Sequence, residues 1–149
     1  MTPYATRYIT EEDLALFAQL RAAIERLPDL DLELDEEGQK IDLSCHMLAR
    51  AAAKVFPVRV RDGYFAGNYQ HSWVETPGGH LVDLYPIAVI GGPIMFEGGL
   101  ASPQRRIYRR LSARKLSRVT PLRFGKNSFR RSVRRIARAL HDAQFAASP

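Results

Sequence analysis

The chain has 149 residues, of which 46% are hydrophobic and 26% are charged, which is enough apolar material for the core of one domain. Its single cysteine excludes an internal disulfide and every zinc or iron–sulfur site that needs several cysteines. The longest apolar stretch, residues 87–96, is interrupted by glycines and a proline and is far shorter than the ~20 residues of a membrane-spanning helix.

The net charge of +6 hides two parts of opposite sign. Residues 1–100 hold 8 lysines and arginines against 15 acidic residues, a net charge of −7, whereas residues 101–149 hold 14 against 1, a net charge of +13. The sequence is therefore an acidic body followed by a basic C-terminal third. Residues 1–13 lack the apolar run of a signal peptide, so we expect a cytoplasmic protein, with export as an effector as an alternative that no pattern marks.

Two helices are predicted in the first half of the chain. Thr10 followed by three acidic residues is a typical helix start, and apolar residues then recur at helical spacing until Pro28. Asp42 predicts the N-cap of a second helix over residues 43–56, a segment rich in helix formers. This assignment places Cys45 in the first turn of the second helix.

The middle of the chain predicts an antiparallel meander. Residues 58–66, 69–75 and 80–85 are rich in strand-forming residues, and Thr-Pro-Gly-Gly at residues 76–79 is a strong turn signal. We expect these three strands to form a sheet on which the Cys45 helix packs.

Two basic helices are predicted in the C-terminal third, at residues 103–116 and 128–143, and the second has a clear apolar stripe. Residues 1–149 are therefore expected to form a single α+β domain. It would consist of the Cys45 helix on an antiparallel sheet of three or more strands, with a basic helical extension at residues 101–149.

Cys45 is a candidate nucleophile. A cysteine attacks as the thiolate, and the first turn of a helix lowers the pKa of a thiol through its free N–H groups and its dipole. An adjacent imidazolium would lower that pKa further. His46 follows directly, but neighbouring helix positions point about 100° apart, so a close pairing with the thiol is not expected. His71, at the start of a predicted strand, is the better candidate for the base.

Asp83, in the next predicted strand, is the candidate for the group that fixes the tautomer of His71. A two-residue turn would place Asp83 opposite Ser72, on the other face of the sheet from His71. A one-residue bulge in the glycine pair, or an equivalent shift, would place Asp83 directly across from His71, and we predict that shift.

The segments around these residues resemble the transglutaminase-like and papain-like superfamily. The His-Ser-Trp-Val-Glu run at residues 71–75 and the Leu-Val-Asp-Leu-Tyr-Pro run at residues 81–86 are similar to its histidine and aspartate strands. In that superfamily a cysteine heads a helix upstream of these strands. The resemblance implies that Cys45 is the nucleophile, His71 the general base and acid, and Asp83 the orienting carboxylate.

The resemblance covers residues 39–87 and extends to an oxyanion donor. Gln39 lies six residues before Cys45, the spacing at which papain-like peptidases place the glutamine that donates to the oxyanion. Such a donor is worth ~3 kcal/mol of transition-state stabilisation. The implied activity is thiol-dependent hydrolysis of an amide or peptide bond through a Cys45 acyl-enzyme, with a peptide or protein substrate and without a metal or organic cofactor.

Related activities and a structural role stay open as alternatives. An amine in place of water would make the protein an acyltransferase, and the same superfamily includes glutamine deamidases and leader-peptide-processing peptidases. Cys45 could instead be a small buried core residue. A zinc site built from Cys45, His46, His71 and His80 fits no common spacing.

The basic C-terminal third has three interpretations. Its arginines could form a solvated face that packs on the acidic residues 29–37. They could bind an anionic partner such as nucleic acid or an acidic protein, in which case the triad would be vestigial, or lie on a membrane surface through residues 128–143. The basic region has no zinc-finger spacing and no paired aromatic platform, so charge alone would give salt-dependent, unspecific binding.

Overall fold

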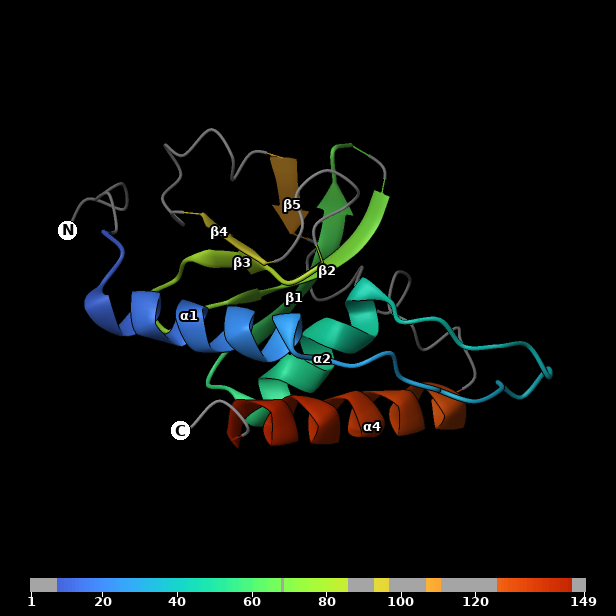
Figure 1. Ribbon diagram of the computed structural model, residues 1–149. Coiled ribbons are helices and arrows are strands. Elements are labelled where there is room, and N and C mark those ends of the chain that lie inside the picture. The colour runs from blue at the N-terminus through green and yellow to red at the C-terminus, as the bar shows by residue number, and fades with distance from the viewer. Residues whose placement is uncertain (1–7, 68, 86–92, 97–106, 111–125, 146–149) are drawn as a thin grey trace.

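A computed structural model describes residues 8–67, 69–85, 93–96, 107–110 and 126–145 of the chain (Figure 1). The elements in chain order are α1 (Glu11–Glu25), α2 (Cys45–Val55), β1 (Arg59–Phe65), β2 (Tyr69–Glu75), β3 (Leu81–Asp83), β4 (Ile94–Phe96), β5 (Tyr108–Arg110) and α4 (Lys126–Phe145). The five strands form one antiparallel sheet in the order β4-β3-β2-β1-β5. The fold is α+β, as predicted, and the predicted meander forms its centre.

Side-chain caps set the starts of the first two helices. The hydroxyl of Thr10 accepts the backbone N–H of Asp13 at 3.2 Å, as expected for the N-cap of α1. The N-cap of α2 is Ser44, whose hydroxyl accepts the N–H three residues later at 3.3 Å, and the prediction of Asp42 was wrong. Because Ser44 caps the helix, Cys45 is its first residue.

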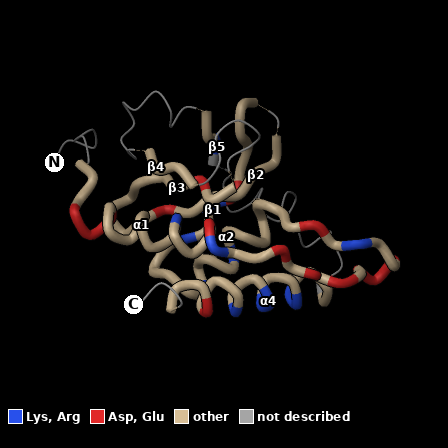
Figure 2. The backbone as a smooth tube through the Cα atoms, viewed as in Figure 1, with Lys and Arg blue, Asp and Glu red and all other residues tan. Residues whose placement is uncertain are grey.

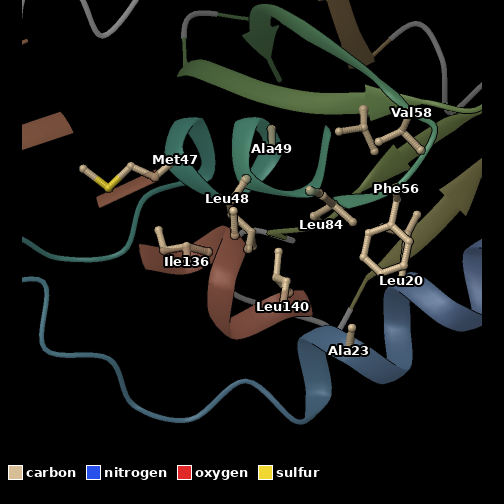
Figure 3. Packing of buried hydrophobic residues seen from close by; sticks show 14 of the residues in the cluster. Leu20, Ala23, Met47, Leu48, Ala49, Phe56, Val58, Leu84, Ile136 and Leu140 are labelled. Carbon is tan, nitrogen blue, oxygen red and sulfur yellow. The ribbon is translucent and has the colours of Figure 1, made fainter. Parts of the chain in front are cut away.

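The main core lies between the sheet and the helices. In Figure 1, α2 lies between the sheet and α4, and α1 runs beside them. Figure 3 shows side chains from these three helices meeting in one cluster, among which Leu20, Leu48, Ile136 and Leu140 are almost fully buried. Burying such a side chain contributes roughly 1.5–3 kcal/mol. No helix in the described ranges combines the length and apolarity that crossing a membrane requires.

A strand, β5, lies within residues 103–116, where a basic helix was predicted. The part of that segment that the structure describes pairs with β1, and the prediction of a helix there was wrong. Tyr108 is only 5% exposed, and its ring lies 5.1 Å from that of Phe65 and 5.3 Å from that of Trp73. Burial of this aromatic ring outweighs the helix propensity of the flanking arginines. The second predicted helix, residues 128–143, is present as α4.

The hairpin between β2 and β3 closes through a loop with a left-handed glycine. The N–H of Gly79 donates to the carbonyl of Thr76, and the N–H of Thr76 donates to the carbonyl of His80, each at 2.9 Å. Gly79 has φ 85°, which places the extra residue of a three-residue hairpin loop in the conformation that glycine adopts most easily.

This loop sets the register of the strands that carry the site. Val74 pairs with Val82, so continuing the register places Asp83 opposite Trp73, two positions from His71. The prediction that Asp83 lies directly across from His71 was therefore wrong. The three-residue loop shifts the register by one residue in the opposite direction, toward Trp73 and not toward His71. The one-residue shift still brings Asp83 and His71 to the same face of the sheet.

An acidic arm, residues 29–40, joins α1 to α2 and docks on α4 (Figure 2). Glu36 accepts the backbone N–H of Ser128 at 2.8 Å and also the hydroxyl of that residue. Arg135 donates to Glu33 at 3.0 Å and to a backbone carbonyl of the arm at 2.6 Å. The interpretation in which the basic face packs on the acidic segment therefore holds for Arg135.

Candidate active site

The Cys45 thiol lies at the start of α2, close to strand β2. Cys45 is the half-buried first residue of α2, where the helix leaves its backbone N–H groups unpaired. The pairing of β2 with β3 extends only to Val74, and the backbone N–H of Ser72 hydrogen-bonds the thiol. His71 and Ser72 are neighbours on β2, so their side chains lie on opposite faces of the sheet, and both His71 and the backbone N–H of Ser72 act on the thiol.

His71 is buried on β2 in an orientation set by Asp83. Its Nε2 lies 2.9 Å from Oδ2 of Asp83, and the two side chains are only 1% and 2% exposed. An ionised carboxylate only accepts hydrogen bonds, so Nε2 carries the hydrogen and Nδ1 is the nitrogen left for the thiol. The predicted relation of these two residues is present in the structure.

Asp83 is held by two further donors. Its Oδ2 also accepts the hydroxyl of Tyr108 at 2.7 Å, and its Oδ1 accepts the backbone N–H of Tyr85 at 3.1 Å. The His71 ring lies 5.7 Å from the ring of Phe65 and 6.2 Å from that of Tyr108. The histidine and its carboxylate are thus fixed inside an aromatic cluster on the side of the sheet away from α2.

Cys45 and His71 shift the pKa of each other in opposite directions. Burial alone would raise the pKa of Cys45, but hydrogen bonds with His46 and His71 outweigh it and lower this pKa from 9.0 to about 6. Burial alone would lower the pKa of His71, but the hydrogen bonds with Asp83 and Cys45 raise it from 6.5 to about 9. Between these values the pair is a thiolate beside an imidazolium.

His46 also reaches the site, although the sequence argument set it aside. Its Nδ1 lies 2.6 Å from Oγ of Ser72, and that hydroxyl in turn donates to Asp62. Arg50 donates two hydrogen bonds to the carboxylate of Asp62, at 3.0 and 2.8 Å. A hydrogen bond with His46 is among the causes that lower the pKa of Cys45, which the prediction from helical angles did not anticipate.

Gln39 lies in the acidic arm, exposed, and its described contacts do not include the thiol. Its backbone N–H donates to the carboxylate of Asp35 and its carbonyl accepts the N–H of that residue, each at 2.8 Å. These bonds, with the bridge between Leu34 and Lys40, fold the segment into the arm. The described contacts of Gln39 therefore belong to the arm and not to the surroundings of Cys45.

Several residues of the site were missed by sequence reasoning. Tyr108 was assigned to a helix, and the network of Arg50, Asp62 and Ser72 was not anticipated. One signal was available: Asp62 and Ser72 are polar residues that pair with each other across β1 and β2, next to the apolar pair Val60 and Val74 on the same face. Within the described part of the chain, no three histidine, cysteine or acidic side chains converge on a metal position.

Comparisons of this chain with protein-family models, with curated proteins and with solved structures found no match. The chemistry of the described residues therefore carries the functional argument.

Proposed function

We propose that this protein is a thiol hydrolase that cleaves an amide or peptide bond through an acyl-enzyme on Cys45, in the manner of the transglutaminase-like and papain-like superfamily. One arrangement carries the proposal: a thiol at a helix start, beside a histidine whose other nitrogen is bound to a buried aspartate. A nucleophile, a base within reach and a group that orients the base are the parts that nucleophilic catalysis requires.

In the first half of the reaction the Cys45 thiolate attacks the carbonyl carbon, and the π electrons of the carbonyl move to its oxygen. Backbone N–H groups of the first turn of α2 stabilise that oxyanion. The His71 imidazolium then gives its Nδ1 proton to the leaving amine as the carbon–nitrogen bond breaks. The product of this half is a thioester on Cys45 and a free amine.

In the second half a water molecule attacks the thioester and gives one proton to His71. Collapse of the tetrahedral intermediate breaks the carbon–sulfur bond, releases the acid and restores the thiolate beside the imidazolium. An amine that attacked in place of water would make the same site a transferase. Water is the acceptor that we propose.

The first experiment measures the rate of Cys45 alkylation by iodoacetamide between about pH 4 and about pH 10. In the wild type we expect an apparent thiol pKa near the value of about 6, well below the ~8.5 of a free cysteine. In His71→Ala we expect this pKa to rise, because the imidazolium is lost. Cys45→Ser supplies the background rate, and a thiol that is inert or titrates normally in both proteins would contradict the proposal.

The second experiment tests amide cleavage itself with a library of fluorogenic peptide amides. We expect turnover in the wild type, none in Cys45→Ser, and an acyl-enzyme detectable as an added mass on the intact protein at short times. Products formed with and without an added primary amine distinguish hydrolysis from acyl transfer. A reactive thiol that forms no acyl-enzyme with any amide would reject the hydrolase and leave the activated cysteine to be explained.

A second candidate function, nucleic-acid binding, is supported by the outer face of α4. Arg130, Arg134 and Arg138 recur every four residues, are exposed, and form no ion pair with any described residue. The apolar stripe of α4 is buried, so this helix has no apolar face to offer a membrane. We expect salt-dependent binding to duplex DNA that the triple change to glutamine weakens and Cys45→Ser leaves unchanged.

A further inference from the structure

A second histidine with its own buried carboxylate lies beside Cys45. His46 is linked through Ser72 to Asp62, and Asp62 is held by both terminal nitrogens of Arg50. Ser72 is 1% exposed and Asp62 is 8% exposed, so both polar groups are withdrawn from water. A buried polar network of this kind is costly unless every member is satisfied, and here each member has a partner.

The network fixes the tautomer of His46. Ionised Asp62 only accepts hydrogen bonds, so the single hydroxyl hydrogen of Ser72 is directed to it. The hydroxyl oxygen must then accept from His46, which places a hydrogen on Nδ1. In the neutral ring Nε2 is therefore an unprotonated nitrogen, and it is the ring nitrogen that remains available to the thiol.

The two histidines approach the thiol from opposite faces of the sheet with equivalent support. His71 is held by Asp83 on the face away from α2, whereas His46 is held by Ser72 and Asp62 on the face that α2 covers. Each ring has one nitrogen bound to a buried acceptor and the other free for Cys45. Hydrogen bonds with both rings lower the pKa of Cys45, and a ring whose other nitrogen is already bound donates such a bond to the thiolate as an imidazolium.

We propose that His46 is a second proton-accepting catalytic residue at Cys45, and that Ser72, Asp62 and Arg50 are the positioning residues that direct its Nε2 to the thiol. This inference rests on the proposed thiol chemistry and adds a second base to it.

The second base matters once His71 has given its proton to the leaving amine. The attacking water can then give its proton to Nδ1 of His71 or, as we propose, to Nε2 of the His46 ring. The carbon–sulfur bond breaks, the thiolate is restored, and the proton stays on an imidazole. A proton left on either ring regenerates a thiolate beside an imidazolium, so the cycle does not depend on one histidine alone.

The charged and titratable groups around this thiol come from four elements. Arg50 lies on α2 with the two reacting residues, Asp62 on β1, His71 on β2 and Asp83 on β3. The fixed positive charge of Arg50 is paired with Asp62.

The test measures iodoacetamide alkylation of Cys45 as a function of pH in the wild type, His46→Ala, His71→Ala and the double variant. We expect each single variant to keep an apparent thiol pKa below the ~8.5 of free cysteine, and the double variant to reach that value. Below its pKa, each unit of increase lowers the alkylation rate at fixed pH about tenfold. A His46→Ala profile that matches the wild type, with the full increase in His71→Ala alone, would overturn the inference.

Two further variants separate this role from a structural one. Ser72→Ala keeps both histidines but frees the ring of His46, so we expect the same direction of shift in thiol pKa, smaller than in His46→Ala. His141→Ala removes an exposed histidine at the far end of α4 and should leave the profile unchanged. A Ser72→Ala profile equal to that of the wild type would show that the network does not act on the thiol.

These readouts keep the inference separate from the proposed function. If no amide is cleaved but the thiol pKa responds to both histidines, the hydrolase proposal fails and the role of His46 stands. If amides are cleaved and the thiol pKa ignores His46, the inference fails and the hydrolase stands. Near-ultraviolet circular dichroism on every variant identifies a change that merely unfolds the protein.

Discussion

The carboxylate of Asp83 connects three strands through side chains that are far apart in the sequence. It lies on β3, its Oδ2 accepts His71 from β2, and the same oxygen accepts the hydroxyl of Tyr108 from β5. Burial and the hydrogen bond to Asp83 both raise the pKa of Tyr108 well above its usual value of 10.0, so the phenol stays a donor. Tyr108 therefore positions the group that positions His71.

Tyr108→Phe removes this hydroxyl while keeping the ring in the aromatic cluster. Hydrogen bonds to charged groups contribute about 1.5–3 kcal/mol, so we expect the free energy of unfolding to fall by roughly that amount in urea titrations. Tyr69→Phe, at a site 67% exposed, is the matched control and should change stability little. Equal stabilities of Tyr108→Phe and the wild type would show that the hydroxyl contributes nothing to the fold.

The opposite shifts of Cys45 and His71 predict different pH profiles for two reactions of one thiol. Alkylation needs only the thiolate, so its rate should rise through about pH 6 and stay high. Amide cleavage also needs a proton on His71 for the leaving amine, so its rate should rise through about 6 and fall again through about 9. Parallel profiles for the two reactions would remove His71 from the role of general acid.

At the level of elements, the close approach of β5 to β1 depends on a glycine. A Cβ on Gly63 would lie 2.1 Å from the backbone oxygen of Arg109 and 2.8 Å from the ring of Trp73. No side chain fits there without moving β5 or the tryptophan. Gly63 therefore lets β5 bring Tyr108 to Asp83.

Gly63→Ala should destabilise the protein by about 1–3 kcal/mol, the usual cost of forcing a methyl group into a packed site. We expect urea titrations to show this loss, and the alkylation profile of Cys45 to change with it because β5 carries Tyr108. Arg59→Ala, at an exposed position of the same strand, controls for the alanine itself. A fully stable Gly63→Ala protein would mean that β5 can withdraw from β1 at little cost.

The elements that sequence predicts well are those whose signals are local. Thr10 and the acids after it start α1, and the turn residues after β2 close the hairpin, because caps and turns are set by neighbours in the chain. β5 could not be predicted because three residues become a strand only against Gly63. The predicted strand register of Asp83 was wrong, because a change of one residue in the length of the loop shifts every pairing after it.

The residues of the candidate site also differ in whether local sequence signals could predict them. Cys45, His71 and Asp83 could be proposed from their residue types and order, and in the structure His71 lies 2.9 Å from Asp83 and acts on the pKa of Cys45. Gln39 was assigned from spacing alone, which fails once the arm folds on itself. His46 was set aside because the sequence does not show that Ser72, on β2, binds its ring.

At the scale of the whole molecule, hydrogen bonds to a carboxylate bring together segments 92 residues apart in the sequence. The acidic arm docks on α4 (Figure 2). At the start of that helix Glu36 accepts the backbone N–H and the hydroxyl of Ser128. A carboxylate at a helix N-terminus satisfies free N–H groups and interacts well with the helix dipole. The contact connects the acidic body to the basic C-terminal third, and its strength should depend on pH.

Glu36→Gln tests this dependence. Hydrogen bonds from the side chain and backbone of Ser128 lower the pKa of Glu36 below 4.5 in the folded state. Its contribution to stability is therefore present above 4.5 and is lost as the pH falls through the folded value. Thermal unfolding at about pH 7 should give a lower Tm for Glu36→Gln than for the wild type, and the difference should shrink toward about pH 3. Glu37→Gln, an exposed neighbour on the arm, should show neither effect, and a pH-independent deficit in Glu36→Gln would mean that the side chain acts by its shape and not by its charge.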